Sequence, residues 1–268
     1  MNTVILTINN KEKTISKIIE NLCKTLSHQT SKIILIFDGC TDNSFKYAKL
    51  ITEKFKINFE FKFYFTDDIW ETRANNFGLK QANTEYVTII QDDMLMLEKY
   101  WDKKLLNHLK KNTDVFSISG RTGLDLYFEN NLHIGKNFIG REYPFGSYSL
   151  IGKITAKILR ILNLYHLLNL KISPSKRLIV NRGPWIIKNK ILKQLNYLDE
   201  DFAPLDLDDA DLCCRAFKEF SMQSLVLPIK FKEINGSKQN NPNSYEVFKK
   251  SFKKNSLILQ NKHSNLQK

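Results

Sequence analysis

Three clusters of acidic residues are the first candidates for chemistry in this sequence. Asp38 and the pair Asp92-Asp93 each follow a short run of apolar residues, and four carboxylates fall between 206 and 211. Short apolar runs are typical of buried parallel strands. Ligands of open parallel sheets bind beyond the carboxyl ends of the strands, so the first two clusters are predicted to face a ligand.

The adjacent carboxylates of Asp92 and Asp93 predict a cation site. Two like charges this close repel each other unless a cation or hydrogen-bond donors compensate them. Mg²⁺ or Mn²⁺ is suited to this task, because a hard cation accepts one or two carboxylates and completes its shell with phosphate oxygens and water. The competing interpretation is that the pair caps the N-terminus of the following helix.

The cluster at 206–211 predicts a proton acceptor at the start of a helix over 209–220. Acidic residues at a helix N-terminus are stabilised by the helix dipole, which is the simpler explanation of their presence. One such residue would be enough for a cap, whereas this cluster has four. A general base must be an unprotonated carboxylate near the reacting hydroxyl group, and a rigid helix start positions one well.

The elements that would position these clusters alternate between strand and helix. Apolar runs and period-2 alternation predict strands at 4–8, 33–37, 59–65, 86–90 and 115–119. Helical spacing predicts helices at 15–26, up to about 54, at 73–82 and at 101–109. This order predicts an α/β fold, with a mostly parallel central sheet flanked by helices.

The second half of the chain has a less regular pattern. Residues 120–149 are predicted to be loops, and 150–170 a basic helical segment with apolar residues on one side. Short extended segments are expected at 178–180 and 184–187. We expect one catalytic domain over 1–225, divided into a nucleotide-sugar-binding half (1–119) and an acceptor-side half (120–225), followed by a lysine-rich C-terminal extension over 226–268.

At these residues the sequence resembles the family 2 glycosyltransferases with the GT-A fold, over roughly residues 3–220. Four segments correspond to family motifs in the same order: Phe-Asp-Gly-Cys-Thr-Asp-Asn-Ser at 37–44, Gln-Asp-Asp-Met at 91–94, Leu-Asn-Tyr-Leu-Asp-Glu-Asp-Phe at 195–202 and Asp-Asp-Ala-Asp-Leu-Cys-Cys-Arg at 208–215. Arg-Gly-Pro-Trp at 182–185 falls where the family has a loop of small residues on the acceptor side. Each segment alone is a weak signal, and their common order makes the resemblance specific.

The resemblance implies that a sugar moves from a nucleotide-diphosphate donor, most simply a UDP-sugar, to an acceptor hydroxyl group with inversion and with a divalent metal. It implies donor contacts from Thr7, Asn9, Glu12, Asp38, Arg73, Asn76 and Asp92, with Asp38 on the base. It implies Asp93 and Asp92 as ligands of Mn²⁺ or Mg²⁺, and Asp209 with Asp208 as the catalytic acidic pair, Asp209 being the general base. It implies Gly183, Trp185 and Asp211 on the acceptor side, and a glycan or lipid-linked acceptor in cell-surface polysaccharide or glycolipid synthesis.

Three positions depart from the family pattern. Phe37 replaces the first aspartate of the base-binding pair, which leaves the donor base less defined. Gln91 replaces the first acid of a strict Asp-x-Asp motif, so the metal would rest on fewer carboxylates. Asp208 replaces the usual glutamate, and its shorter arm could change which acid faces the acceptor.

The charge distribution predicts an anionic partner. The formal net charge is +13, and residues 143–198 contain ten lysines and arginines but no acidic residue. Nucleic acid, an anionic membrane surface or a phosphorylated substrate would each fit, and a compositional drift toward lysine is the alternative. The N-terminus has no signal-peptide pattern and the four cysteines form no Cys-x-x-Cys pair. A cytoplasmic protein is expected, with peripheral attachment at the inner membrane face as a second option.

Two other functions compete with the transferase. A nucleotidyltransferase or diphosphate-cleaving enzyme would need the metal pair but not the acidic cluster at 206–211, and the sequence has no glycine-rich phosphate loop. A nucleic-acid-binding protein would need basic residues interleaved with exposed aromatic residues, whereas the aromatic stripe over 59–65 is predicted to be buried. No nucleic-acid partner is therefore expected.

Overall fold

An eight-stranded sheet forms the centre of the protein in a computed structural model, which describes residues 1–133, 135–140, 158, 162, 174–234 and 242–266. Its strands lie in the order β11-β14-β6-β13-β4-β1-β2-β3. They are β1 (Asn2–Ile8), β2 (Thr30–Asp38), β3 (Glu60–Thr66), β4 (Tyr86–Ile90), β6 (Val115–Ser119), β11 (Ser175–Arg177), β13 (Trp185–Lys188) and β14 (Gln223–Val226).

The central sheet is mostly parallel, as the sequence predicted. β1 pairs in parallel with both β2 and β4, β2 with β3, and β14 with β6. Two strands are exceptions within the sheet: β13 lies antiparallel between β4 and β6, and the edge strand β11 lies antiparallel to β14. The predicted short segment at 184–187 is thus a central strand.

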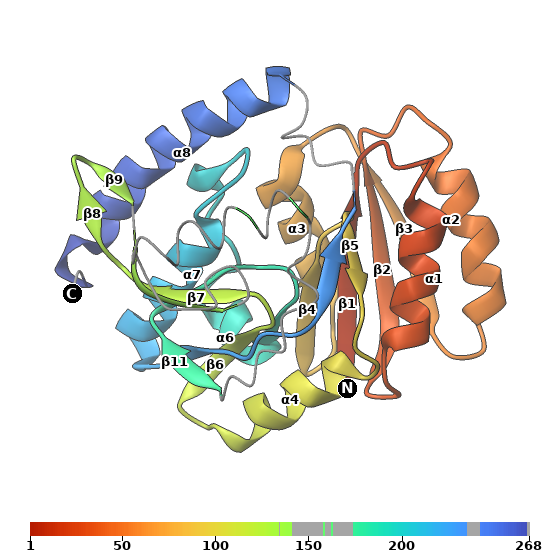
Figure 1. The fold of residues 1–268 in the computed structure, drawn as a ribbon, viewed down its shortest axis with the longest axis horizontal. Coiled ribbons are helices and arrows are strands. Elements are labelled where there is room, and N and C mark those ends of the chain that lie inside the picture. Colours follow the sequence, from red (N-terminus) through yellow and green to blue (C-terminus); the bar gives the residue numbers. More distant parts are fainter. Residues whose placement is uncertain (134, 141–157, 159–161, 163–173, 235–241, 267–268) are drawn as a thin grey trace.

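Helices cover both faces of this sheet (Figure 1). One face packs against α1 (Ile15–Thr25), α2 (Ser44–Thr52) and α4 (Trp101–Lys111), and the other against α3 (Trp70–Gln81), α6 (Asn189–Gln194) and α7 (Asp208–Phe220). β1 contributes to both cores, with Val4 and Leu6 on one side and Ile5 on the other, all fully buried. A strand buried on both faces needs a continuous apolar run, and residues 4–6 provide one.

The second half contains more structure than the sequence pattern indicated. Residues 120–149 were predicted to be loops, but they include β7 (Thr122–Asp125), β8 (Phe128–Glu129), β9 (Leu132–His133) and β10 (Lys136–Gly140). β7 pairs with β10 and with β12 (Ile179–Val180), while β8 and β9 form a hairpin. Strands of two to five residues are too short to show a clear alternation of apolar and polar residues, which is why the pattern missed them.

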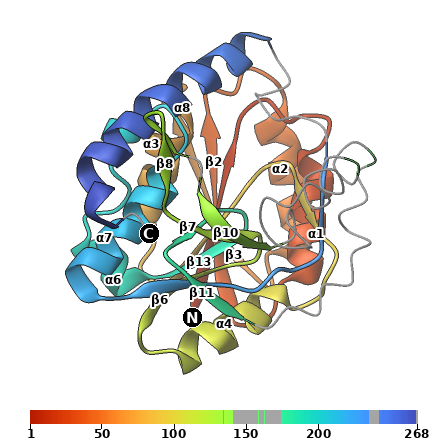
Figure 2. The same ribbon diagram turned by 60° about the vertical axis from the view of Figure 1, so that its left-hand side comes forward.

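The predicted C-terminal extension packs onto the same α/β unit. β15 (Phe231–Glu233) pairs with β5 (Met94–Met96), directly after the Asp92-Asp93 pair. The helix α8 (Pro242–His263), followed by a short helical turn at Ser264–Leu266, runs along the outside of the molecule beside α7 (Figure 2). The predicted basic helical segment at 150–170 lies outside the described residues, apart from Ile158 and Leu162. None of the helices in the described part combines the length and the apolar composition that a membrane span requires.

The aromatic stripe over 59–65 is less buried than predicted. Phe59 is 8% exposed, but Phe65 at the other end of the stripe is 60% exposed. The reason is that β3 is the edge strand of the sheet, so that its outer positions lack a neighbouring strand. Phe65 still stacks on Phe37 of the adjacent strand, with 5.5 Å between ring centroids.

Gly78 allows α3 to lie close to the sheet, and we predict that Gly78→Ala destabilises the fold. A Cβ atom at this position would lie 2.5 Å from Ile36 Cδ1 and 2.7 Å from Ile5 Cγ2, both on fully buried side chains. Overpacking of this kind costs about 1–3 kcal/mol, which exceeds the gain of about 0.5–1 kcal/mol from replacing a helical glycine. Urea denaturation should show a lower free energy of unfolding, whereas Gln81→Ala on the exposed side of α3 should not lower it. Equal or greater stability of Gly78→Ala would contradict the close packing.

Candidate active site

Asn9 joins three strand ends at the carboxyl edge of the sheet. It follows β1, and its side-chain Nδ2 donates to the backbone carbonyl of Asp38 at the end of β2, at 2.6 Å. Its backbone N–H donates to Asp92 Oδ2, just after β4, at 3.2 Å. The structure therefore brings the predicted donor residues Asn9, Asp38 and Asp92 together, as expected for the carboxyl ends of neighbouring parallel strands.

The Asp38 carboxylate orders the loop between β3 and α3. Its oxygens accept hydrogen bonds from Thr66 Oγ1 at 2.9 Å, Ile69 N at 2.7 Å and Trp70 N at 3.0 Å, and the residue is 2% exposed. The loop lies so close to the end of β2 that a Cβ atom on Gly39, which has φ +58°, would be 2.5 Å from Asp68 Cβ. Asp38 thus fixes the loop between β3 and α3 through hydrogen bonds to its own carboxylate.

The other predicted donor residues near β1 also make contacts within the protein. Thr7 Oγ1 donates to Asn75 Oδ1 at 3.1 Å, which joins β1 to α3. Glu12 accepts from the backbone N–H of Asn43 at 3.2 Å, and its own N–H donates to Asp42 Oδ2 at 2.9 Å. These bonds fix the two loops that follow β1 and β2 against each other.

The two aspartates after β4 have different surroundings. Lys11, which is 6% exposed, lies 3.4 Å from Asp92 Oδ1 and partly compensates its charge. Burial nevertheless raises the pKa of Asp92 to about 7, more than Lys11 lowers it. Burial also raises the pKa of Asp93, followed by the negative charge of Glu233. Asp93 Oδ1 is buried without a hydrogen-bond partner in the described structure.

These residues fit a divalent cation that takes most of its ligands from a substrate. A buried carboxylate oxygen without a donor, beside a second carboxylate, is a site where a hard cation would relieve the repulsion. Among the described residues, no group of three or more His, Cys, Asp or Glu side chains could hold a metal ion. Phosphate oxygens and water would therefore have to complete the shell, which is how Mg²⁺ is usually bound in phosphate-handling sites.

Arg182 organises the acidic cluster at the start of α7. Its guanidinium group forms ion pairs with Asp208, with Asp209 Oδ2 at 3.7 Å and with Glu71 Oε1 at 3.3 Å. Its backbone N–H also donates to Asp209 Oδ2, at 3.1 Å. The Arg182 side chain is 7% exposed, so one buried cation offsets three carboxylates that would otherwise repel each other.

Gly183 connects this acidic cluster to the residues after β4. A Cβ atom at Gly183, which has φ +85°, would lie 2.7 Å from Gln91 Oε1 and 3.0 Å from Met94 Sδ. The backbone next to Arg182 thus touches the residues on either side of the Asp92-Asp93 pair. The charge of Glu71 also raises the pKa of both Asp93 and Asp206. The two predicted halves of the site are therefore neighbours.

Three aspartates of the acidic cluster differ in accessibility. The side chain of Asp208 is 0% exposed and that of Asp209 is 13% exposed, which makes Asp209 the more accessible of the predicted catalytic pair. Asp206 has a buried Oδ2 without a hydrogen-bond partner in the described structure. Burial, and then the charge of Asp209, raises the pKa of Asp206 to about 7.

Four predicted site residues make contacts away from this cluster. Asn76 Nδ2 donates to the carbonyl of Leu198 at 2.8 Å, and Arg73 Nε lies 3.5 Å from Glu200 Oε2.

Trp185 is 0% exposed and packs in the core beneath the site. Asp211 is also 0% exposed. Its carboxylate binds Arg215 Nε at 2.6 Å and His263 Nε2 at 2.8 Å.

The C-terminal helix fastens the loop that leads into α7. Asn255 Nδ2 lies within hydrogen-bonding distance of the carbonyls of Phe202, Leu205 and Asp206, at 2.7, 2.9 and 2.8 Å. Together with the His263–Asp211 contact, these bonds tie α8 to both ends of the acidic segment. The carbonyl of Pro204 in the same loop accepts from Thr72 N in α3, at 3.1 Å.

Several of these partners were not predicted from the sequence. Lys11, Glu71, Asn255 and Glu233 are single polar residues without a motif, and only the fold shows which carboxylates they face. Arg182 was part of a predicted acceptor-side segment, but its role as the counter-charge was not recognised. The available signal was an arginine directly before Gly-Pro in a stretch without acidic residues, since such a cation, if buried, needs carboxylates from elsewhere in the chain.

The fold is an α/β sheet whose carboxyl edge gathers the carboxylates of Asp38, Asp92 and Asp93. Residues 3–165, more than half of the chain, match the family described as glycosyl transferase family 2. The chain therefore belongs to glycosyl transferase family 2. This membership favours the transferase over the two competing functions.

Similar proteins agree with this assignment. An uncharacterized glycosyltransferase of Haemophilus influenzae is 35% identical over 92 residues, which are 32% of this chain and 36% of that protein. The structure of GalNAc-T7 with UDP, GalNAc and Mn²⁺ is similar with a TM-score of 0.63 and 13% identity, over 92% of this chain and 48% of that one. The mannosyltransferase PcManGT of Pyrobaculum calidifontis, in complex with GDP-Man and Mn²⁺, gives a TM-score of 0.54 and 14% identity over 85% and 54%. The chain thus spans between about a third and about half of the length of these proteins.

The raised pKa of Asp206 predicts that Asp206→Asn stabilises the protein at high pH. The folded state keeps this proton up to about pH 7, whereas an ordinary aspartate loses it near 3.8. Between these values the unfolded state binds fewer protons, so the stability of the wild type falls as the pH rises. The asparagine does not titrate and tolerates the φ of +80° at this position.

The measurement is urea denaturation at pH 5 and at pH 8. The advantage of Asp206→Asn over the wild type should be on the order of 2 kcal/mol larger at pH 8, because one pKa unit corresponds to about 1.4 kcal/mol. Asp67→Asn, at an exposed aspartate, serves as the control and should show no such difference. An advantage that is independent of pH would mean that Asp206 is ionised at both pH values.

Proposed function

We propose that this protein transfers a sugar from a nucleotide-diphosphate donor to an acceptor hydroxyl group with inversion at the anomeric carbon. The observation that supports this most directly is the contact between the Arg182-Gly183 backbone and Gln91. Gly183 directly follows Arg182, whose backbone N–H donates to Asp209, so this approach supports a site that combines the carboxylates after β4 with that of Asp209. Family membership supports the reaction class, and the geometry supports the residue roles proposed below.

Asp93 is the proposed principal ligand of Mn²⁺ or Mg²⁺, with Asp92 as its neighbour in the site. Asp93 has the buried oxygen without a donor, whereas Asp92 already has Lys11 and the N–H of Asn9 as partners. When bound, such an ion would stabilise the negative charge of the leaving nucleoside diphosphate as a Lewis acid. Lys11 would add a second positive charge at the same place.

The donor nucleotide is proposed to lie over the carboxyl ends of β1, β2 and β3. Asn9, Glu12 and the loop ordered by Asp38 form this edge, with Thr7 behind them. Because the Asp38 carboxylate already accepts three hydrogen bonds, we assign it the placement of this loop and thereby of the base. Uracil is the base we favour. The two solved relatives named above were complexed with UDP and with GDP-Man, respectively, so guanine is the alternative to test.

Asp209 is the proposed general base. Its carboxylate would take the proton of the acceptor hydroxyl group, the acceptor oxygen would form a bond to the anomeric carbon, and the bond from that carbon to the diphosphate would break. Asp209 suits this role better than Asp208 because it is the more exposed of the two. Arg182 positions Asp209 through its backbone N–H. The proposed acceptor is a glycan or a lipid-linked glycan, as in cell-surface polysaccharide or glycolipid synthesis.

A nucleoside diphosphate with Mn²⁺ should raise the melting temperature, since a ligand that binds only the folded state stabilises it. We expect the largest increase for UDP, of about 5–10 °C near a hundred times Kd for a chain of this size. Differential scanning fluorimetry with UDP and GDP, each with and without Mn²⁺, measures this. Asp93→Ala should abolish the metal-dependent part, and Asp114→Ala, at an exposed aspartate outside the site, should keep it. An equal increase without metal would count against the cation site.

Asp209→Asn should bind the donor nucleotide normally but lose transfer. Removing a general base costs about 10²–10⁴-fold in rate, while the nucleotide contacts are made by other residues. The readout is release of nucleoside diphosphate from a panel of UDP- and GDP-sugars with Mn²⁺, together with the nucleotide-induced shift in melting temperature. Asp201→Asn, at an exposed position nearby, is the matched control. Turnover of Asp209→Asn close to that of the wild type would remove this residue as the base.

A further inference from the structure

A groove of about 620 Å³ lies between α8 and the β8–β9 hairpin, on a part of the surface that the proposed reaction does not use. Its lining is mostly apolar, and the residues that form it are Asn130, Asn131, Leu132, Lys249, Lys250, Phe252, Lys253 and Leu257. We call it the α8 groove. Figure 2 shows α8 along the edge of the molecule with β8 next to it.

The walls of the α8 groove are held in place by the rest of the protein. On the inner side of α8, Asn255 contacts the loop before α7, and Lys254 Nζ donates to the carbonyl of Asp201 at 2.9 Å. The hairpin has a two-residue turn in which Asn130 and Asn131 both have positive φ, of 50° and 61°. Such turns match the twist of paired strands. The groove is therefore part of the fold itself.

The rim of the α8 groove is positively charged. Residues 242–263 contain five lysines and one acidic residue, Glu246. Glu246 lies 3.9 Å from Lys249 and offsets its charge. Lys250 and Lys253 are exposed and form no ion pair with any residue in the described part of the chain. The exposed Glu129 next to the hairpin turn is the other acidic neighbour, which leaves the rim with an excess of positive charge.

The floor of the α8 groove presents apolar side chains to solvent. Leu257 is 39% exposed and Leu132 is 38% exposed, and the partly buried Phe252 belongs to the same lining. One turn before the lysines, Tyr245 is 48% exposed. Lysines beside exposed leucine and aromatic residues on one helix are the pattern of helices that lie at a membrane surface.

We propose that the α8 groove docks the protein on an anionic lipid bilayer. Lys250 and Lys253 would contact the headgroup phosphates, and the acyl chain of a bound lipid would enter the groove and contact Leu132, Phe252 and Leu257. A soluble polyanion would satisfy the lysines but would leave the apolar floor uncovered, so the combination favours lipid. This inference goes beyond the proposed reaction, since docking requires neither donor nor metal.

The test is co-sedimentation with vesicles of phosphatidylcholine alone and of phosphatidylcholine with phosphatidylglycerol. We expect binding only to the anionic vesicles, weakened by salt. The double variant Lys250→Glu/Lys253→Glu should bind at least about tenfold more weakly, because each basic residue near an anionic surface contributes roughly fivefold in affinity. Leu257→Ser should also weaken binding to vesicles, while its binding to soluble polyphosphate stays unchanged.

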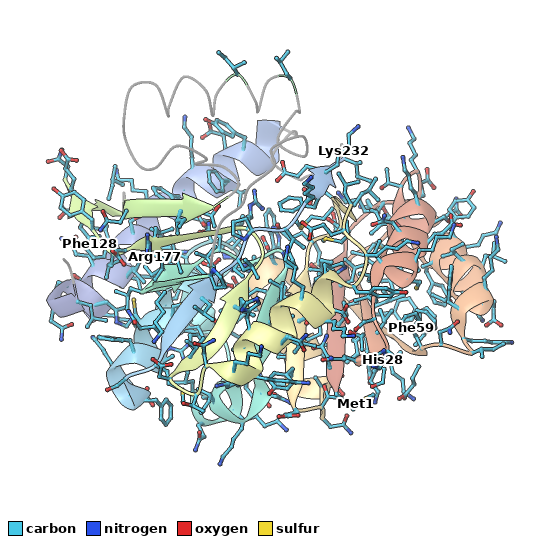
Figure 3. All side chains as sticks on the ribbon, turned by 60° about the horizontal axis from the view of Figure 1, so that its bottom comes forward. Met1, His28, Phe59, Phe128, Arg177 and Lys232 are labelled. Atoms are coloured by element: carbon cyan, nitrogen blue, oxygen red, sulfur yellow. The ribbon has the colours of Figure 1, made fainter. Side chains whose placement is uncertain are left out.

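The matched control is Lys46→Glu/Lys49→Glu, which makes the same change in net charge on two exposed lysines of α2. The control lies far from the groove: Figure 3 shows Phe128 of the hairpin strand β8 at one end of the molecule and Phe59, near α2, toward the other. The control should bind vesicles like the wild type, and all variants should keep the nucleotide-induced shift in melting temperature. Equal binding to neutral vesicles, equal loss in the control, or an unchanged affinity of either groove variant would overturn the proposal. Retained vesicle binding without any nucleotide effect would overturn the proposed reaction and leave the docking site standing.

Discussion

The site depends on compensation of negative charge at one edge of a parallel sheet. Glu71, Asp208 and Asp209 converge on Arg182, and Asp92 converges on Lys11. Each of these cations is largely buried, where an unpaired charge would be costly. Removing either one would leave several carboxylates in mutual repulsion. Buried carboxylate oxygens without a hydrogen-bond partner in the described structure remain on Asp93, Asp206 and Asp208. The oxygen of Asp93 lies beside a second carboxylate, that of Asp92, which supports the cation site proposed there.

Much of this arrangement could be predicted because it follows from short-range rules. The strand ends that carry Asp38 and Asp92 are local features of the sequence, and parallel strands bring their carboxyl ends to one edge. The start of α7 at Asp208 could be predicted for the same reason, from a cluster of acids followed by helical spacing. In each case the residue type and its immediate neighbours determine the position, without knowledge of distant contacts.

The rest depends on contacts between residues far apart in the chain. Glu71 and Arg182 are separated by 111 residues, and Asn255 lies 49 residues beyond the carbonyl of Asp206. No periodicity in the sequence indicates that two residues so far apart are in contact. The sequence pattern does not predict the direction in which a side chain points either. Trp185 alternates into the core because β13 is a central strand, and Asp211 points toward Arg215 and His263 because it lies on the inner side of α7. The same sequence pattern would have allowed the opposite orientation of both.

The insertion of β13 between β4 and β6 has a consequence for how the protein is made. While the first 184 residues are being synthesised, neither β4 nor β6 has its neighbour on that side, because the strand that fills the gap is Trp185–Lys188. Both strands then carry unpaired N–H and C=O groups, and open edges of this kind attract other chains. The middle of the sheet therefore stays open until β13 has been synthesised, and the other side of β6 until β14 follows.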